Sequence, residues 1–408
     1  MKITQIFLRN WRCFSSAACP IGSKLIITGP CGSGKTSFLD AFCFLRDLAR
    51  GVNLVSAVDR RGGLSHLRNL QARYPETDIV LMLYLRDNQK KEWIYRLRLG
   101  EDGSAPFIKE ELIWYASALL LRRPDREDKK RAIRRQESCL SPRLVTPSIE
   151  VLARFLRSLH YENPQPESIR NQNLMMAMSS DFQEDDLLVR IIRTPERLRK
   201  LRLRRLSEVM KTLIEGFGQL RLDRDYLGRW QLSASCEHWR PRVSWRDWTE
   251  WPEAGLRLFS IFWTILERDT PLLIEEPETG LHPEAVIQMP RIIRELVRSS
   301  HRPPQLIITT HEPYFLKDRL IRPEEIVLLI PDKSGTKMAT GWPKNLISSF
   351  LEDRAAVAGE VKARMQAEKQ PWLPLFSSQP GGKNDSVDRK KDKFYHLSRK
   401  SNSGAIND

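Results

Sequence analysis

The sequence predicts an α/β protein with a mainly parallel core sheet, an antiparallel β-subdomain and a helical insertion. Short apolar runs alternate with helical patterns near the N-terminus and again between residues 256 and 330, which indicates parallel strands joined by helices. Between residues 78 and 115 the apolar residues alternate with a period of two, as in an antiparallel meander. A basic segment lies between the meander and the C-terminal strands and helices, and it predicts the insertion.

The first 45 residues read as strand, turn, strand, loop and helix. KITQIFLRNW alternates apolar residues, SKLIITG is a short β-branched run that ends at glycine, and SGKTSFLDAFCFLRDLA has helical spacing. The meander follows as DIVLMLYLRD, EWIYRLRLG and FIKEELIWYA, separated by turn signals.

The insertion, residues 122–215, is expected to be helical with a strongly basic surface. Basic residues crowd its last third: Arg193, Arg197, Arg199, Lys200, Arg202, Arg204 and Arg205. The whole chain has 67 Lys and Arg against 51 Asp and Glu, a formal net charge of +16. Because such an excess attracts polyanions, residues 122–205 are either a solvated helix face or a surface that contacts DNA or RNA phosphates.

The C-terminal half returns to strands and helices. The strand-like QLRLDRDY and GRWQLSASCEHWRPRVSW precede a helix, LRLFSIFWTILERD, and three buried strands in PLLIEE, QLIITTH and EEIVLLI. Five tryptophans before that helix either pack in a core or form a docking surface: Trp230, Trp239, Trp245, Trp248 and Trp251. We therefore expect four regions, 1–121, 122–215, 216–332 and 333–408, with a disordered tail from about residue 377.

Composition excludes several classes of protein. Hydrophobic residues make up 41% of the chain, enough for a packed core, and charged residues make up 29%. No run approaches the ~18 apolar residues of a membrane helix, and the N-terminus lacks the apolar core of a signal peptide. The six cysteines form no C-x-x-C pair, which fits reduced thiols in a cytoplasmic protein.

The segment Gly29–Thr36 reads GPCGSGKT and matches G-x-x-x-x-G-K-[ST] between a buried strand and a helix. In such a loop the backbone N–H groups converge on phosphate oxygens, and the helix N-terminus adds partial positive charge. Lys35 is expected to reach the β- and γ-phosphates, and the Thr36 hydroxyl to ligate Mg²⁺.

Two further strands end in residues suited to phosphoryl chemistry. Glu275 and Glu276 follow the apolar run PLLI; the first is expected to hold Mg²⁺ and the second to polarise an attacking water. His311 ends the strand LIITT, where it is expected to reach the γ-phosphate. The alternative interpretation is that these three are ordinary polar residues at strand ends.

The blocks GPCGSGKTS, LLIEEPETGLHP and LIITTHEPYFL together resemble the soluble SMC/RecF/OLD-like AAA ATPases, a branch of the ABC-type ATPases. The resemblance covers roughly residues 1–118 and 217–332. It implies a P-loop NTPase head of the ABC type, standing alone without a Toprim nuclease domain. It also implies ATP and Mg²⁺ held between two heads, with Glu276 as the catalytic carboxylate and His311 as the switch histidine.

The family's signature motif is degenerate in this chain. Where the family carries L-S-x-G-x-x-R, residues 251–257 read WPEAGLR, so that Pro252 and Ala254 replace the serine and glycine. Gln71 is the candidate for the family's Q-loop glutamine. The complete set of expected nucleotide-binding residues is Gly29, Gly32, Ser33, Gly34, Lys35, Thr36, Ser37, Gln71 and Gly255, with Thr36 and Glu275 as metal ligands.

The leading hypothesis is an ATP-binding and ATP-hydrolysing switch that dimerises through its heads or forms a higher oligomer. It would control a separate effector, such as a nuclease or toxin, in bacterial anti-phage defence, with nucleic-acid sensing through the insertion and no membrane partner. The degenerate signature predicts slow or partner-activated hydrolysis. The alternatives are a RecF-like accessory ATPase of DNA repair or replication, and a non-hydrolysing ATP-bound scaffold.

Overall fold

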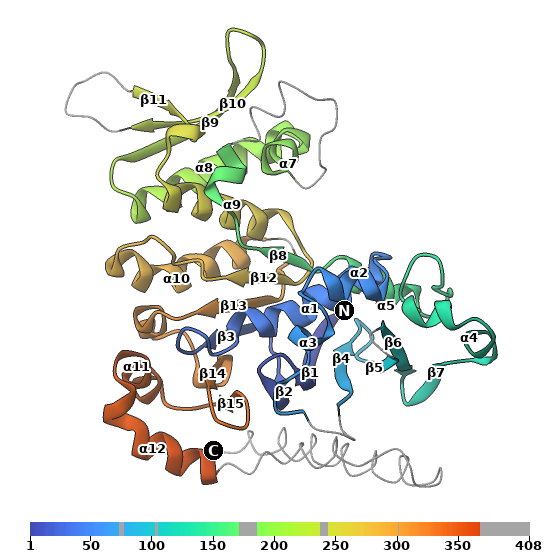
Figure 1. Cartoon of the computed structure of the whole chain (residues 1–408). Coiled ribbons are helices and arrows are strands. Elements are labelled where there is room, and N and C mark those ends of the chain that lie inside the picture. Colours follow the sequence, from blue (N-terminus) through green and yellow to red (C-terminus); the bar gives the residue numbers. More distant parts are fainter. Residues whose placement is uncertain (73–76, 103–104, 171–185, 237–243, 301, 368–408) are drawn as a thin grey trace. The chain divides into compact units, whose positions relative to one another are not determined.

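The computed structural model describes residues 1–72, 77–102, 105–170, 186–236, 244–300 and 302–367. Residues 1–367 form one compact unit, shown in Figure 1, and residues 368–408 form a second. The second unit, with the predicted disordered tail, lies outside the described residues.

The core sheet is mainly parallel, as predicted. Its order among the described residues is β15–β14–β3–β13–β12–β8, and only β15 runs antiparallel to its neighbour. The strands are β3 (Lys24–Thr28), β8 (His160–Glu162), β12 (Leu272–Glu275), β13 (Leu306–Thr310), β14 (Ile326–Ile330) and β15 (Lys337–Thr340). Strands β12, β13 and β14 are buried on both faces, which explains their uninterrupted apolar runs.

Successive residues of β3 enter two different hydrophobic cores. Leu25 and Ile27 pack with α1 (Lys35–Ala49), α2 (Leu54–Asp59), α5 (Glu150–Arg157) and the antiparallel sheet. Ile26 packs with the opposite core, to which α8 (Glu196–Leu213), α9 (Glu253–Glu267), α10 (Pro283–Ser299) and α11 (Lys344–Glu352) contribute. Side chains of a strand alternate between its faces, so the strand before the phosphate loop is anchored on both sides.

The predicted antiparallel subdomain is a sheet of order β2–β1–β4–β5–β6–β7. Its strands are β1 (Lys2–Trp11), β2 (Phe14–Pro20), β4 (Ile79–Arg86), β5 (Glu92–Asp102), β6 (Ala105–Tyr115) and β7 (Ala118–Arg123). The short helix α3 (Leu64–Leu67) precedes β4.

The predicted insertion at 122–215 is interrupted by a strand of the core, which corrects its boundaries. His160–Glu162 forms β8, which pairs in parallel with β12 at the edge of the core sheet. The described helical elements around it are α4 (Arg126–Lys130), η1 (Ala132–Gln136), α5, α7 (Leu187–Arg193) and α8. A strand of three residues containing histidine and glutamate is too short and too polar to give a periodic signal.

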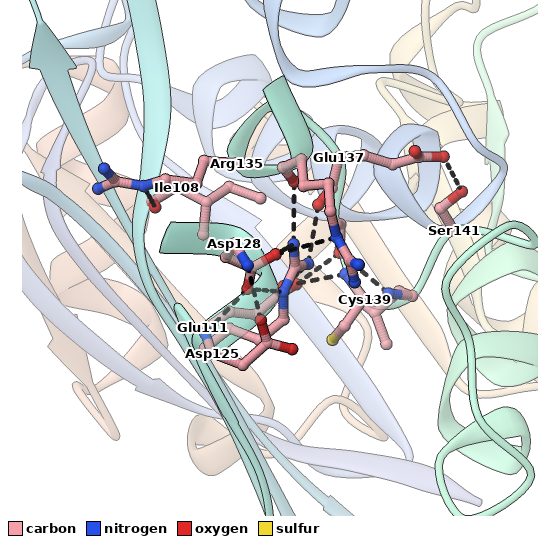
Figure 2. Close-up of polar contacts among 12 residues, drawn as sticks. Ile108, Glu111, Asp125, Asp128, Arg135, Glu137, Cys139 and Ser141 are labelled. Atoms are coloured by element: carbon pink, nitrogen blue, oxygen red, sulfur yellow. Dashed lines mark hydrogen bonds and ion pairs between the residues drawn. The ribbon is translucent and has the colours of Figure 1, made fainter. Parts of the chain in front are cut away.

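The start of the insertion is fixed to the antiparallel sheet by a buried ion-pair network (Figure 2). The Arg123 guanidinium donates to both Asp128 oxygens, at 2.7 and 2.8 Å, and to Glu111 Oε2 at 3.1 Å. It also donates to the carbonyls of Arg134 and Glu137. The bidentate hydrogen bond from Arg123 lowers the pKa of Asp128 to about 2.

A small antiparallel sheet of β9 (Phe217–Arg224), β10 (Trp230–Cys236) and β11 (Ser244–Asp247) packs through β9 on α8. Of the predicted tryptophan cluster, Trp248 and Trp251 are core residues, Trp230 and Trp245 are half-buried, and Trp239 lies outside the described residues. The described chain ends in α12 (Arg354–Ala367). None of its helices is long and apolar enough to cross a bilayer.

Candidate functional site

The phosphate loop runs from the end of β3 to the start of α1, where the sequence predicts it. Two of its glycines lie where no side chain fits. A Cβ on Gly34, whose φ is +100°, would lie 2.2 Å from Cys13 Sγ, and one on Gly29 would lie 2.6 Å from Ser33 Oγ. Gly32 is exposed with φ +74°, and a Cβ there would meet nothing within 4 Å. The backbone of this loop can therefore approach a ligand closely.

Neighbouring segments hold the loop from behind. Thr336 Oγ1 donates to the Ser33 carbonyl at 3.0 Å, and Trp11 Nε1 donates to the Ser37 carbonyl at 2.8 Å. The N–H groups of the first turn of α1 have no helical acceptors, as in every helix. The buried hydroxyl of Ser33 has no hydrogen-bond partner among the described residues. The loop and the start of α1 therefore contain hydrogen-bond donors that the rest of the described chain leaves unpaired.

Lys35 joins the phosphate loop to the strand end that carries Glu276. Its side chain is only 6% exposed. Its Nζ donates to the carbonyls of Gly29 and Pro30 at 3.0 and 3.3 Å and lies 3.5 Å from Glu276 Oε1.

The Glu275 carboxylate is buried at the end of β12 and accepts hydrogen bonds from three side chains. The Thr36 hydroxyl donates to one of its oxygens, and the Tyr161 hydroxyl donates to the other. Asn163 Nδ2 also donates to this second oxygen, at 3.2 Å. A hydroxyl beside a carboxylate is the oxygen donor set that Mg²⁺ prefers. The two predicted metal ligands therefore lie in contact.

Glu276 and His311 form an ion pair, with 3.1 Å between Glu276 Oε1 and His311 Nδ1. This pairing lowers the pKa of Glu276 and raises the pKa of His311. Glu276 has φ +42°, which is rare for a residue with a Cβ. Its N–H donates to the Thr309 carbonyl at 3.1 Å, so β13 stabilises this strained conformation.

A second acid, Glu278, lies behind this pair and connects it to the end of β13. Its Oε1 accepts hydrogen bonds from Thr310 Oγ1 at 2.5 Å and from the His311 N–H at 3.3 Å. Its Oε2 is buried without a hydrogen-bond partner among the described residues. Burial raises the pKa of Glu278 to about 7. Sequence reasoning assigned no role to this residue.

The signature-like segment lies at the start of α9. Pro252 precedes the helix and is exposed, whereas Gly255 is buried, and a Cβ there would lie 3.2 Å from Ile214 Cδ1. Gly255 therefore faces the interior of its own chain. Arg257 is also buried and donates to the Pro164 carbonyl at 2.7 Å and to the Glu276 carbonyl at 3.4 Å. Its guanidinium thus connects α9 to both the Glu276 loop and the loop after β8.

Gln71 lies apart from these contacts. It is exposed, and its N–H donates to Asn69 Oδ1 at 2.8 Å. Among the described residues it makes no hydrogen bond or ion pair with the phosphate loop. Asn163, which follows β8, is the amide side chain that contacts Glu275. Tyr161 and Asn163 were missed because their strand was not predicted.

Comparison with known families identifies the class of protein. Residues 25–317 match the family described as "AAA domain, putative AbiEii toxin, Type IV TA system". The chain belongs to this family. A comparison with curated protein sequences found no significant match.

Solved structures give the fold. The chain is similar to an SMC head bound to the C-winged helix domain of ScpA, with a TM-score of 0.54 and 16% identity over 83% of this chain and 98% of that one. The Pyrococcus furiosus Smc head with an extended coiled coil, bound to the C-terminal domain of ScpA, has a TM-score of 0.49 and 13% identity over 86% and 98% of the two chains. The Thermotoga maritima SMC head has a TM-score of 0.45 and 13% identity, over 83% of this chain and 99% of that one. Family and fold together define an ATPase of the ABC/SMC-like AAA type.

Proposed function

We propose that this chain binds ATP with Mg²⁺ at the junction of α1, β12 and β13 and hydrolyses it. One observation carries the proposal: Lys35 and Thr36 of the phosphate loop contact Glu276 and Glu275, about 240 residues later in the chain. The exposed backbone at Gly32, the unpartnered Ser33 hydroxyl and the Thr36–Glu275 donor pair fit a magnesium-bound triphosphate.

The roles of the side chains follow from their chemistry. Lys35 and the N–H groups at the start of α1 would bind the phosphates, and Thr36 and Glu275 would hold the metal ion. Bound Mg²⁺ supplies charge neutralisation at the phosphate oxygens. Glu276, ionised and paired with His311, would accept a proton from the attacking water, and His311 would keep the carboxylate oriented. Asn163, rather than the exposed Gln71, is the amide suited to act beside Glu275.

The test of the binding site is a direct titration with ATP in the presence of Mg²⁺. The Lys35→Ala variant should lose ATP binding, because the loop loses its cation. The matched control is Lys362→Ala, on the exposed face of α12, which should bind as the wild type does. Unchanged affinity of Lys35→Ala would refute the site.

We further propose that two copies associate through their heads and control an effector protein. The family description names a toxin of a toxin–antitoxin system, which supports a role alongside an effector protein. The SMC head of similar fold was solved with a protein partner bound, which supports a partner surface on this fold. The inward-facing Gly255 favours slow or partner-dependent hydrolysis. Light scattering with and without ATP tests association, and a single monomeric mass in both conditions would contradict it.

A nucleic-acid contact through the basic insertion is the last part of the proposal. Residues 193–236 contain eleven Lys and Arg against five Asp and Glu. Exposed positions of α8 include Arg197, Lys200, Arg204 and Arg205. Binding of labelled DNA that weakens steeply with salt would support a phosphate contact. A repair role predicts binding that strengthens with ATP, whereas a non-hydrolysing scaffold predicts no phosphate release under any of these conditions.

A further inference from the structure

The turn between β9 and β10 presents two apolar side chains to solvent. Tyr226 is 92% exposed and Leu227 is 60% exposed, and they are adjacent in the chain. Solvent-exposed aromatic side chains at the tip of a turn contribute nothing to the core. The turn is visible between β9 and β10 in Figure 1.

Asp225 makes this turn rigid. Its Oδ1 accepts the N–H groups of Leu227 and Arg229 at 2.8 and 2.9 Å, and its Oδ2 accepts Arg229 Nε at 2.7 Å. Arg224 Nη1 donates to the Gly228 carbonyl at 2.8 Å. A side chain on a preorganised turn loses little backbone entropy when it binds a partner.

Arginine–aromatic stacks surround the base of the turn. The guanidinium of Arg224 lies 4.6 Å from the centre of the Trp230 ring, and that of Arg199, from α8, lies 5.6 Å from the same ring. Farther from the turn, Arg221 lies 3.8 Å from the centre of the Trp245 ring and forms an ion pair with Asp223. The Arg199–Trp230 contact places the base of the turn beside α8, whose exposed positions include Arg197, Lys200, Arg204 and Arg205.

We infer that the 225–229 turn binds an unpaired nucleobase, with Tyr226 stacked on the base and the flanking arginines near the phosphates. An exposed aromatic ring stacks on any base, and cations beside it attract the strand. The excess of basic residues in 193–236 favours a polyanion over an apolar protein groove. The inference rests on the proposed nucleic-acid contact. It adds that the 225–229 turn makes part of this contact and that it recognises single-stranded nucleic acid.

The experiment uses fluorescence anisotropy with the full chain and three labelled probes: a 30-nucleotide single-stranded DNA, the RNA of the same sequence and the corresponding DNA duplex. Tyr226→Ala should weaken binding of the single strands by roughly 5- to 150-fold, the range for one base–aromatic stack, and affect the duplex much less. Tyr226→Phe should bind as the wild type does, because the ring is retained. The control is Leu70→Ala, which removes a similarly exposed apolar side chain (94%) outside both the turn and the basic insertion.

The outcomes distinguish base stacking at the 225–229 turn from nucleic-acid binding by the chain as a whole. If Arg204→Ala/Arg205→Ala weakens binding while Tyr226→Ala does not, the chain contacts nucleic acid but the turn does not, and the inference is wrong. If the wild type binds none of the probes, with or without ATP, the nucleic-acid part of the proposed function fails as well. Thermal melting of each variant checks that the fold is retained.

Discussion

The Tyr161 hydroxyl donates a hydrogen bond to the Glu275 carboxylate, although the two residues are 114 positions apart in the chain. The contact exists because β8 and β12 are parallel neighbours, so their carboxyl ends meet at one edge of the sheet. Burial, together with the nearby Glu275, raises the pKa of Tyr161, so that the phenol remains a donor at neutral pH. Tyr161 thus orients the carboxylate of a proposed metal ligand.

Tyr161→Phe should weaken Mg²⁺ activation. Removing a partner of a metal-bound carboxylate typically costs about 10-fold or more in metal affinity or activity. We expect the Mg²⁺ concentration that gives half-maximal ATP turnover to rise by about that factor. Tyr226→Phe, which removes an exposed hydroxyl, is the control, and an unchanged Mg²⁺ dependence of Tyr161→Phe would rule out the positioning role.

Glu276→Gln should retain ATP binding and lose hydrolysis. The amide keeps the size of the side chain but cannot accept the proton of the attacking water, which costs about 10²- to 10⁴-fold in rate. Phosphate release measures the loss, and an ATP titration confirms that binding is retained. Glu284→Gln, on the exposed start of α10, should behave as the wild type. Normal turnover by Glu276→Gln would show that another group is the base.

Glu278→Gln should change how stability depends on pH. Burial raises the pKa of Glu278 to about 7 in the folded protein, above its ordinary value of 4.5, so the folded state holds its proton more tightly than the unfolded state does. The wild type should therefore lose stability as the pH rises from about 4.5 to 7, by on the order of 3 kcal/mol. In the glutamine variant, the free energy of unfolding should not decrease in this way, because the amide does not titrate.

Urea unfolding at pH 5 and pH 8 measures this difference. The free energy of unfolding of Glu278→Gln, relative to the wild type, should be higher at pH 8 than at pH 5 by about 2 to 3 kcal/mol. Parallel pH dependence of the two proteins would show that Glu278 is not held neutral by its surroundings.

His311→Gln should remove a second pH effect. The pKa of His311 is raised by its pairing with Glu276, so the stabilising charge on the imidazole is fully present below about pH 6.5 and is lost as the pH rises through the folded pKa. The pKa of Glu276 is lowered, so its contribution is present above pH 4.5 and is lost on acidification. The Glu276–His311 pair should therefore stabilise the loop most between about pH 4.5 and pH 6.5.

The ATPase rate of the wild type should be highest in this same pH range and should decline at lower and at higher pH. The alkaline decline should disappear in His311→Gln, while the acid decline, which belongs to Glu276, should remain. An alkaline limb that persists in the variant would assign it to a different group.

The phosphate loop, Glu275, Glu276 and His311 could be located from the sequence because each lies at or just after the end of a buried strand and belongs to a contiguous motif. The orientation of their side chains toward one another depends on strand order, which the parallel pattern also implied. The sequence therefore predicted most of the core sheet and the residues that meet at its carboxyl edge.

Other contacts depend on tertiary packing that leaves no local signal. β8 has three residues and no alternation, so Tyr161 and Asn163 were hidden in the predicted insertion. Gly255 faces inward because Ile214, just after α8, packs against it. Gln71 was chosen by its order along the chain, and order does not determine which loop reaches the site.

The division of β3 between two cores has a consequence for biosynthesis. One face of the strand packs on segments made early, whereas its pairing partners β13 and β14 are translated some 280 to 300 residues later. A nascent chain on the ribosome would therefore expose the phosphate loop on a strand with open edges. We therefore expect the proposed nucleotide site to form only after β13, which ends next to His311, has been translated.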